Sequence, residues 1–139
     1  MIDAGGDIVA GKIPPGMDGW KIAINLPETE EPMKRKLMIE SKAVATSGDL
    51  YQYIELNGNR YSHIINPATG YAVTNLRNVT VITDDSASAD GLATALSIFP
   101  KKQAIRSITK FSSSEVPLEI LKNNHSYFYR SHSLPSFSN

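Results

Sequence analysis

The sequence has 139 residues, and its 14 basic and 14 acidic side chains cancel to a formal net charge of zero, so nothing favours a nucleic-acid partner. The absence of cysteine excludes disulfides and zinc sites built on thiolates. No apolar run is long enough to cross a membrane, and the first residues lack the charged and apolar regions of a signal peptide.

The N-terminal third of the chain predicts strands separated by loops. We expect one strand at Ile2–Ala10, in which the Gly5-Gly6 pair marks either a bulge or a close approach of the backbone to another group. Gly11–Gly19 is rich in glycine and proline, which predicts a loop. Trp20–Leu26 alternates apolar and polar residues and predicts a strand. After a polar connection, Lys36–Thr46 predicts another.

Residues 51–65 carry the clearest hairpin pattern, because two strand-like runs flank Asn57-Gly58, a pair that supplies the positive φ angles of a tight turn. The second run must end at Asn66-Pro67, since proline has no N–H and favours an extended residue before it. His63 is therefore expected beside a rigid loop. On spacing alone, a histidine that is merely hydrogen-bonded at a strand end is the better interpretation.

Val79–Thr83 is rich in β-branched residues and predicts a short strand. After it, the spacing of the apolar residues changes from that of a strand to that of a helix. Apolar residues recur at helical spacing through Asp84–Phe99, which predicts a helix that Pro100 ends. A second, more polar helix is expected at Lys101–Phe111.

Two further strands, Val116–Leu121 and Ser126–Arg130, are expected to form a hairpin around Asn123-Asn124. Residues 131–139 are serine-rich and predict a loose tail. The order of strands, two helices and strands predicts an α+β fold in a single domain over residues 1–139. We expect a mostly antiparallel sheet with both helices on one face.

Asp90 and Thr94 are four residues apart, so a helix places them on one face, one turn apart. Both offer oxygen, which suits a hard cation such as Mg²⁺ or Ca²⁺. The nearby helix N-terminus also favours phosphate. The alternative is that Asp90 only interacts with the helix dipole and that Thr94 only bonds to the preceding turn.

The sequence resembles a known family in its longer motifs. The run ATSGDLYQYIELNGNRYSHIINPATG, followed by VTVIT and ASADGLATALSIF, is similar to the C-terminal half of the ApbE-like flavin transferases, the FAD:protein FMN transferases. Gly5-Gly6-Asp7 also falls in family order. The loop carries Asn66 where many members have aspartate, and the helix carries Gly91 in place of a usual alanine.

The resemblance implies an activity and a set of site residues. Members of this family transfer FMN from FAD to a threonine hydroxyl of a target protein, release AMP and require a divalent metal, usually Mg²⁺. By resemblance, Asp90 and Thr94 are the metal ligands. His63 corresponds to the histidine that takes the threonine proton and contacts the cofactor. Ile64 corresponds to a position that touches the flavin nucleotide.

The resemblance covers only the second half of the family's length, so we expect a two-part site of which this chain holds one part. Three interpretations stay open. The chain is a transferase completed by a partner chain, a non-catalytic module that binds flavin or metal-nucleotide, or a structural remnant that dimerises through an exposed sheet edge. The family acts mostly in the periplasm or at a membrane, whereas a natural start at Met1 would imply the cytoplasm.

Overall fold

The computed structural model describes residues 1–24, 35–49, 52–74, 78–108, 117–122 and 125–130. These residues form, in chain order, β1 (Ile2–Ala4), β2 (Asp7–Ala10), β3 (Trp20–Ile24), β4 (Arg35–Ile39), β5 (Lys42–Gly48), β6 (Tyr53–Leu56), β7 (Asn59–Ser62), β8 (Asn78–Thr83), α1 (Ser86–Ile98), α2 (Lys101–Ile108), β9 (Pro117–Lys122) and β10 (His125–Arg130).

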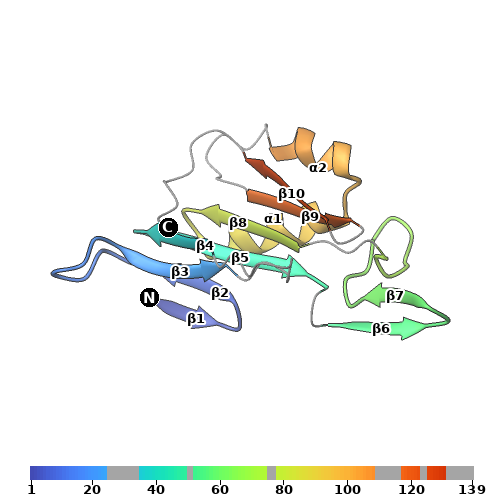
Figure 1. Ribbon diagram of the computed structural model, residues 1–139, viewed down its shortest axis with the longest axis horizontal. Coiled ribbons are helices and arrows are strands. Elements are labelled where there is room, and N and C mark those ends of the chain that lie inside the picture. The colour runs from blue at the N-terminus through green and yellow to red at the C-terminus, as the bar shows by residue number, and fades with distance from the viewer. Residues whose placement is uncertain (25–34, 50–51, 75–77, 109–116, 123–124, 131–139) are drawn as a thin grey trace.

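The main sheet has six strands in the order β1-β2-β5-β8-β9-β10, and each neighbouring pair is antiparallel (Figure 1). The β9–β10 pairing confirms the C-terminal hairpin expected from the sequence. Strands β3 and β4 form a separate antiparallel pair, and so do β6 and β7.

The two faces of the main sheet are covered by different layers, because successive side chains of β5 point to opposite sides. Ala43 and Ala45 face the helices, whereas Val44 faces the β3–β4 pair. The helical side is a cluster of small and aliphatic residues, namely Ala43, Ala45, Val79, Val81, Ala89, Ala93, Leu96 and Ala104. The prediction of an α+β fold with two consecutive helices on one face is confirmed.

Helix α1 begins at Ser86, and Asp85 is its N-cap. The Asp85 carboxylate accepts the Ser88 N–H at 2.8 Å, which satisfies one of the backbone donors left free in a first turn. The helix ends at Ile98, and Phe99 has the extended backbone expected before Pro100. The predicted helix is therefore confirmed to within two residues at its start and one at its end.

The prediction of one strand at Ile2–Ala10 was wrong. The segment is a hairpin in which β1 pairs with β2 and the Gly5-Gly6 pair forms the turn. Both glycines have positive φ angles, 73° and 107°, which residues with a Cβ rarely adopt. The Gly6 N–H donates to the Asp3 carboxylate at 3.0 Å and stabilises the turn.

The prediction of one strand at Lys36–Thr46 was also wrong, because the segment is divided between β4 and β5. The chain turns at Glu40-Ser41, where Ser41 has a positive φ of 48° and donates its N–H to the Gly11 carbonyl at 3.1 Å. Since β4 pairs with β3 and β5 belongs to the main sheet, this turn carries the chain from one layer to the next.

Strands β6 and β7 form an arm, residues 53–62, that extends beside the end of β5 (Figure 1). Asn57 and Gly58 have positive φ angles of 52° and 74°, which confirms the predicted tight turn. The second strand ends at Ser62, three residues earlier than expected. The chain then folds into a loop closed by an isolated bridge between Ile65 and Ala72.

Two expectations lie outside the described residues: the polar connection after Leu26 and the loose tail at residues 131–139. Among the described residues, neither helix has the length and apolar character needed to cross a membrane.

Candidate functional site

A pocket of about 540 Å³ lies where the end of β5 meets the β1–β2 turn, α1 and the loop after the arm. Three of the four residues singled out by the sequence line it: His63, Asp90 and Thr94. Its wall also contains main-chain and side-chain groups of Asp3, Gly5, Gly6, Asp7, Thr46, Ser47, Gly48, Gln52 and Asn78. The structure thus brings together residues from Asp3 to Thr94, among them His63 and Thr94, which lie 31 positions apart in the sequence.

Helix α1 places Asp90 and Thr94 at the pocket because they lie beside its buried face. Ala89 and Ala93 are fully buried against the sheet, and their neighbours Asp90 and Thr94 therefore lie at the edge of the packed face. The Thr94 hydroxyl donates to the Ser47 hydroxyl at 3.4 Å. This contact ties the helix to β5 at the floor of the pocket.

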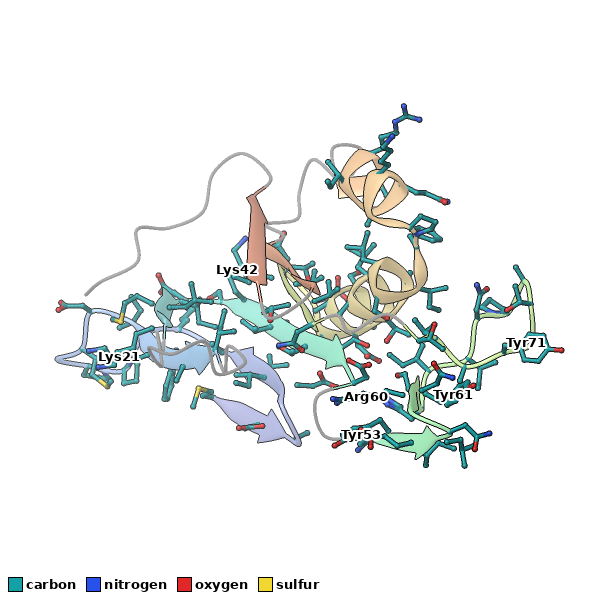
Figure 2. The ribbon with its side chains drawn as sticks, turned by 45° about the vertical axis from the view of Figure 1, so that its right-hand side comes forward. Lys21, Lys42, Tyr53, Arg60, Tyr61 and Tyr71 are labelled. Atoms are coloured by element: carbon teal, nitrogen blue, oxygen red, sulfur yellow. The ribbon has the colours of Figure 1, made fainter. Side chains whose placement is uncertain are left out.

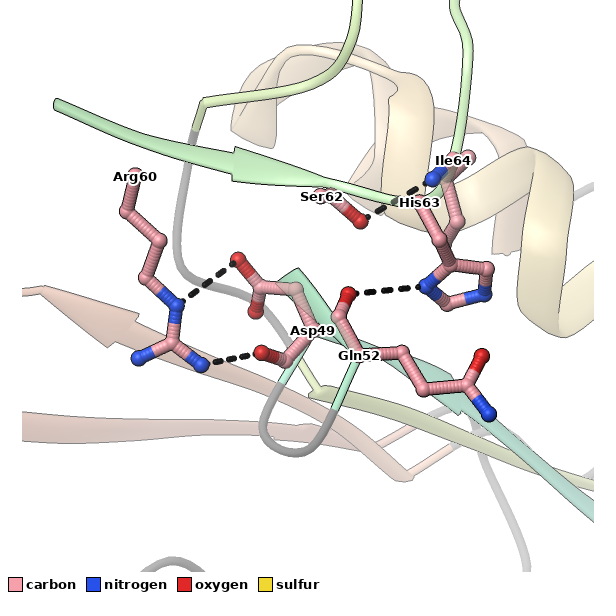
Figure 3. A network of polar contacts seen from close by, with 6 residues as sticks. All are labelled: Asp49, Gln52, Arg60, Ser62, His63 and Ile64. Carbon is pink, nitrogen blue, oxygen red and sulfur yellow. Dashed lines mark hydrogen bonds and ion pairs between the residues drawn. The ribbon is translucent and has the colours of Figure 1, made fainter. Parts of the chain in front are cut away.

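The ring of His63 is held by one carbonyl oxygen. The Gln52 carbonyl accepts the His63 backbone N–H at 3.2 Å and lies 3.1 Å from Nδ1 of the same residue. A carbonyl only accepts, so Nδ1 must carry the hydrogen, and in the neutral ring Nε2 is left with the lone pair. Figure 3 shows Nε2 on the side of the ring away from this carbonyl.

The loop after His63 is rigid for the reason expected from its sequence. The Asn66 side chain accepts the Ala68 N–H at 3.0 Å, and its carbonyl accepts the Gly70 N–H at 2.8 Å. The asparagine in this position therefore keeps the turn-forming contacts without a charge. The φ of Gly70 is 72°, which explains the glycine at the end of the turn.

The structure places Ile64 differently from the other three residues. Its side chain is buried, its N–H donates to the Ser62 hydroxyl at 3.1 Å, and its carbonyl accepts the Val73 N–H at 2.9 Å. It does not belong to the described residues that line the pocket. Contact between Ile64 and a flavin nucleotide stays a prediction.

Asp7 is a pocket residue that the sequence reasoning did not single out. Partial burial raises the pKa of its carboxyl above the ordinary 3.8, and the carboxylates of Asp90 and Asp3 raise it further. Asp90 and Asp7 thus place two like charges in the same pocket. The glycine pair before Asp7 was noted in the sequence. The pairing of β2 with the distant strand β5, however, is what brings Asp7 towards α1.

The donor set at the pocket consists of hard oxygen atoms. Asp90 offers a carboxylate and Thr94 a hydroxyl, and Mg²⁺ prefers such ligands while keeping several waters. Within the described residues, no three histidine, cysteine or acidic side chains lie together in a way that could hold a metal ion. The residues fit a weakly held hard cation with few protein ligands and do not fit a zinc site.

The fold matches part of the fold of solved flavin transferases. The chain is similar to the flavinyl transferase ApbE of Pseudomonas stutzeri, with a TM-score of 0.75 and 26% identity. The match covers 94% of this chain and 40% of that one. It is also similar to the flavin transferase ApbE of Vibrio cholerae, with a TM-score of 0.76 and 30% identity, over 94% of this chain and 41% of that one.

Residues 1–117 match the model of the ApbE family, and the chain belongs to this family. Among curated relatives, it is 38% identical over 109 residues to the FAD:protein FMN transferase of Haemophilus influenzae. It is 37% identical over 109 residues to the enzyme of the same name from Vibrio cholerae. Each match covers 76% of this chain, so the resemblance recognised in the sequence is confirmed.

The chain spans about a third of the length of these curated relatives, 31% and 32%. It covers 40% and 41% of the two solved structures.

Proposed function

We propose that this chain supplies the metal-binding and proton-accepting part of an FAD:protein FMN transferase, which moves FMN from FAD to a threonine hydroxyl of a target protein. The observation that carries the proposal is the placement of His63, Asp90 and Thr94 around one pocket. The names of the curated relatives support it, since they are FAD:protein FMN transferases.

In this proposal Asp90 and Thr94 hold Mg²⁺ through oxygen, and Ser47 orients the Thr94 hydroxyl. The ion, when bound, neutralises the charge of the FAD pyrophosphate and stabilises the departing phosphate. Asp7 adds negative charge to the same pocket, which favours a cation there.

His63 accepts the proton in the proposed transfer. The threonine oxygen forms a bond to the phosphorus of the FMN half, the pyrophosphate P–O bond breaks, and AMP leaves with that oxygen. The threonine proton goes to Nε2 of His63, which holds the lone pair in the neutral ring when Nδ1–H faces the Gln52 carbonyl. A fixed ring beside the pocket suits this task, because a threonine hydroxyl is a weak nucleophile.

The test is an incubation of the full chain with FAD, Mg²⁺ and threonine-containing peptides. We expect fluorescent flavin to become covalently attached to peptide and one AMP to be released for each flavin attached. Asp90→Asn should abolish both signals. Asp84→Asn is the matched control, because Asp84 is an exposed carboxylate that pairs with Lys42 at 2.7 Å and does not line the pocket.

A second candidate is a module that binds flavin nucleotide and metal without transfer, and the oxygen donors of Asp90 and Thr94 at one pocket support binding whether or not transfer follows. In this case FAD fluorescence should be quenched saturably in the presence of Mg²⁺, and Asp90→Asn should weaken the quenching, while no flavin becomes attached to peptide. If FAD and Mg²⁺ change neither the fluorescence nor the melting temperature, both candidates are excluded in favour of a structural role, for which sedimentation would test dimer formation.

A further inference from the structure

We propose that Arg60 is a positioning residue that acts through Asp49 to hold His63 over the pocket. The proposal rests on the proposed function of His63, but the contacts that carry it belong to a different part of the molecule. Arg60 itself does not line the pocket, so any effect that it has on the reaction must pass through its neighbours.

The arm that leads to His63 is a sheet of its own. Within the described residues, β6 and β7 pair only with each other and do not join a ladder of the main sheet. Figure 2 shows the arm extending from the end of β5, with Arg60 and Tyr53 at the end nearest the rest of the protein and Tyr71 on the loop beyond. An arm attached in this way needs side-chain contacts to fix its angle.

Arg60 provides such contacts in three directions. Its guanidinium lies over the Tyr53 ring, 3.4 Å from the ring centroid. Its terminal nitrogen donates to the main-chain carbonyl of Asp49. Its Nε lies 3.9 Å from the Asp49 carboxylate. Asp49 is only 3% exposed and directly follows the last residue of β5, so Arg60 joins the arm to the main sheet.

The arm and the residues after β5 meet at two points, which are three residues apart in both parts of the chain. Arg60 meets Asp49, and three residues further along each segment His63 meets Gln52 (Figure 3). Arg60 and His63 are three residues apart along the end of β7, and three residues of extended strand span about 10 Å. A single point of contact would leave the arm free to rotate, whereas two separated points fix its direction and the position of the His63 ring.

The chemistry of Arg60 suits a clamp, by which we mean its joint contacts with Tyr53 and Asp49 that hold the arm to the main sheet. A guanidinium stays charged at all working pH values and offers several N–H donors in one plane, so it can lie on an aromatic ring while its edge bonds to oxygen. Lysine has one compact ammonium and cannot make both contacts in the same geometry. The near-complete burial of Asp49 strengthens the attraction, because water screens it little.

The test combines NMR measurements on the ring nitrogens of His63 with kinetics of the transfer reaction. Long-range ¹H–¹⁵N NMR spectra of the full chain report which nitrogen carries the hydrogen. We expect wild type to show the Nδ1–H form, and Arg60→Gln to show a mixture with the Nε2–H form. In the transfer assay we expect kcat to fall by about 10²-fold, the effect of roughly 1 Å of misplacement, while KM for FAD changes less than about 3-fold.

Arg60→Lys should recover only part of the wild-type tautomer population, because it keeps the charge and loses the planar contacts. Arg106→Gln, which changes an exposed arginine of α2, is the matched control and should leave spectrum and kinetics unchanged. If Arg60→Gln does not fold, Tyr53→Leu, which removes the ring under the guanidinium, gives the same NMR readout.

A lower melting temperature with an unchanged His63 tautomer and unchanged kcat would overturn the proposal, because Arg60 would then only stabilise the arm. The NMR measurement needs no activity. A chain without transferase activity whose His63 tautomer depends on Arg60 would therefore refute the proposed function and leave the clamp standing.

Discussion

Nδ1 of His63 lies 3.1 Å from the carbonyl oxygen of Gln52, and the same oxygen accepts the backbone N–H of His63. A main-chain atom thus fixes both the position of the residue and the tautomer of its ring. In the neutral ring the lone pair is then on Nε2, which is the proton acceptor in the proposed function. The side chain of Gln52 is not part of this contact.

Replacement of His63 should therefore separate binding from transfer. His63→Asn keeps a donor that can reach the Gln52 carbonyl but has no basic nitrogen, so we expect flavin transfer to fall by about 10²–10⁴-fold. FAD binding, measured by fluorescence quenching, should change little. Gln52→Ala is the control that keeps the carbonyl, and it should preserve the tautomer of His63. A His63→Asn protein with the wild-type rate would show that another group takes the proton.

Metal binding should depend on the two oxygen donors of α1. We expect Asp90→Asn and Thr94→Val each to weaken the binding of Mn²⁺, used in place of Mg²⁺. Electron paramagnetic resonance measures this binding. Asp90→Asn should have the larger effect, at least 10-fold, because it removes a charge as well as a ligand. Asp84→Asn should bind Mn²⁺ as wild type does. Equal affinity in all four proteins would place the metal elsewhere.

Local signals in the sequence were enough for much of the fold. The sequence required a tight turn at Asn57-Gly58, the end of a strand before Pro67 and the end of a helix before Pro100. Each requirement is met within a few residues of its position. The helical period of α1 also placed Asp90 and Thr94 on the same side. Such features depend on the backbone chemistry of neighbouring residues and need no knowledge of the sheet.

Other features depend on contacts between distant segments and had no local signal. The turn at Ser41 lacks glycine and proline, so the alternation of residues 36–46 looked continuous. The approach of Asp7 to Asp90 follows from the register of β2 against β5 and from the packing of α1 on that sheet. The acceptor for His63 is a carbonyl, which every residue has, so Gln52 could not be identified from its side chain.

Removal of the Asp7 charge should stabilise the metal-free protein. The pKa of Asp7 is raised in the folded state, first by partial burial and then by Asp90 and Asp3, so its ionised form opposes folding. The stability that its protonation gives is fully present below the ordinary value of 3.8 and is lost as the pH rises through the folded-state pKa. We expect Asp7→Asn to raise the melting temperature at pH 7 in EDTA, and the gain to vanish near pH 3.

The matched control for this experiment is Asp3→Asn, because the Asp3 carboxylate also repels that of Asp7. It should give a smaller gain at pH 7, because it removes one of the repulsions and also weakens the hydrogen bond that the Asp3 carboxylate accepts from Gly6. An Asp7→Asn protein that melts below wild type at pH 7 would show that the ionised Asp7 makes a favourable contact that outweighs the repulsion.

The cap of α1 should have the opposite dependence on pH. The N–H and hydroxyl of Ser88 donate to the Asp85 carboxylate and lower its pKa below the ordinary 3.8. Its contribution is therefore present above pH 3.8 and is lost as the pH falls through the lower, folded-state value. We expect Asp85→Ala to lower the melting temperature at pH 7 and to converge with wild type in acid. Asp85→Asn, which can still accept the Ser88 N–H, should melt between them, and identical melting curves for all three proteins would show that the cap does not limit the stability of α1.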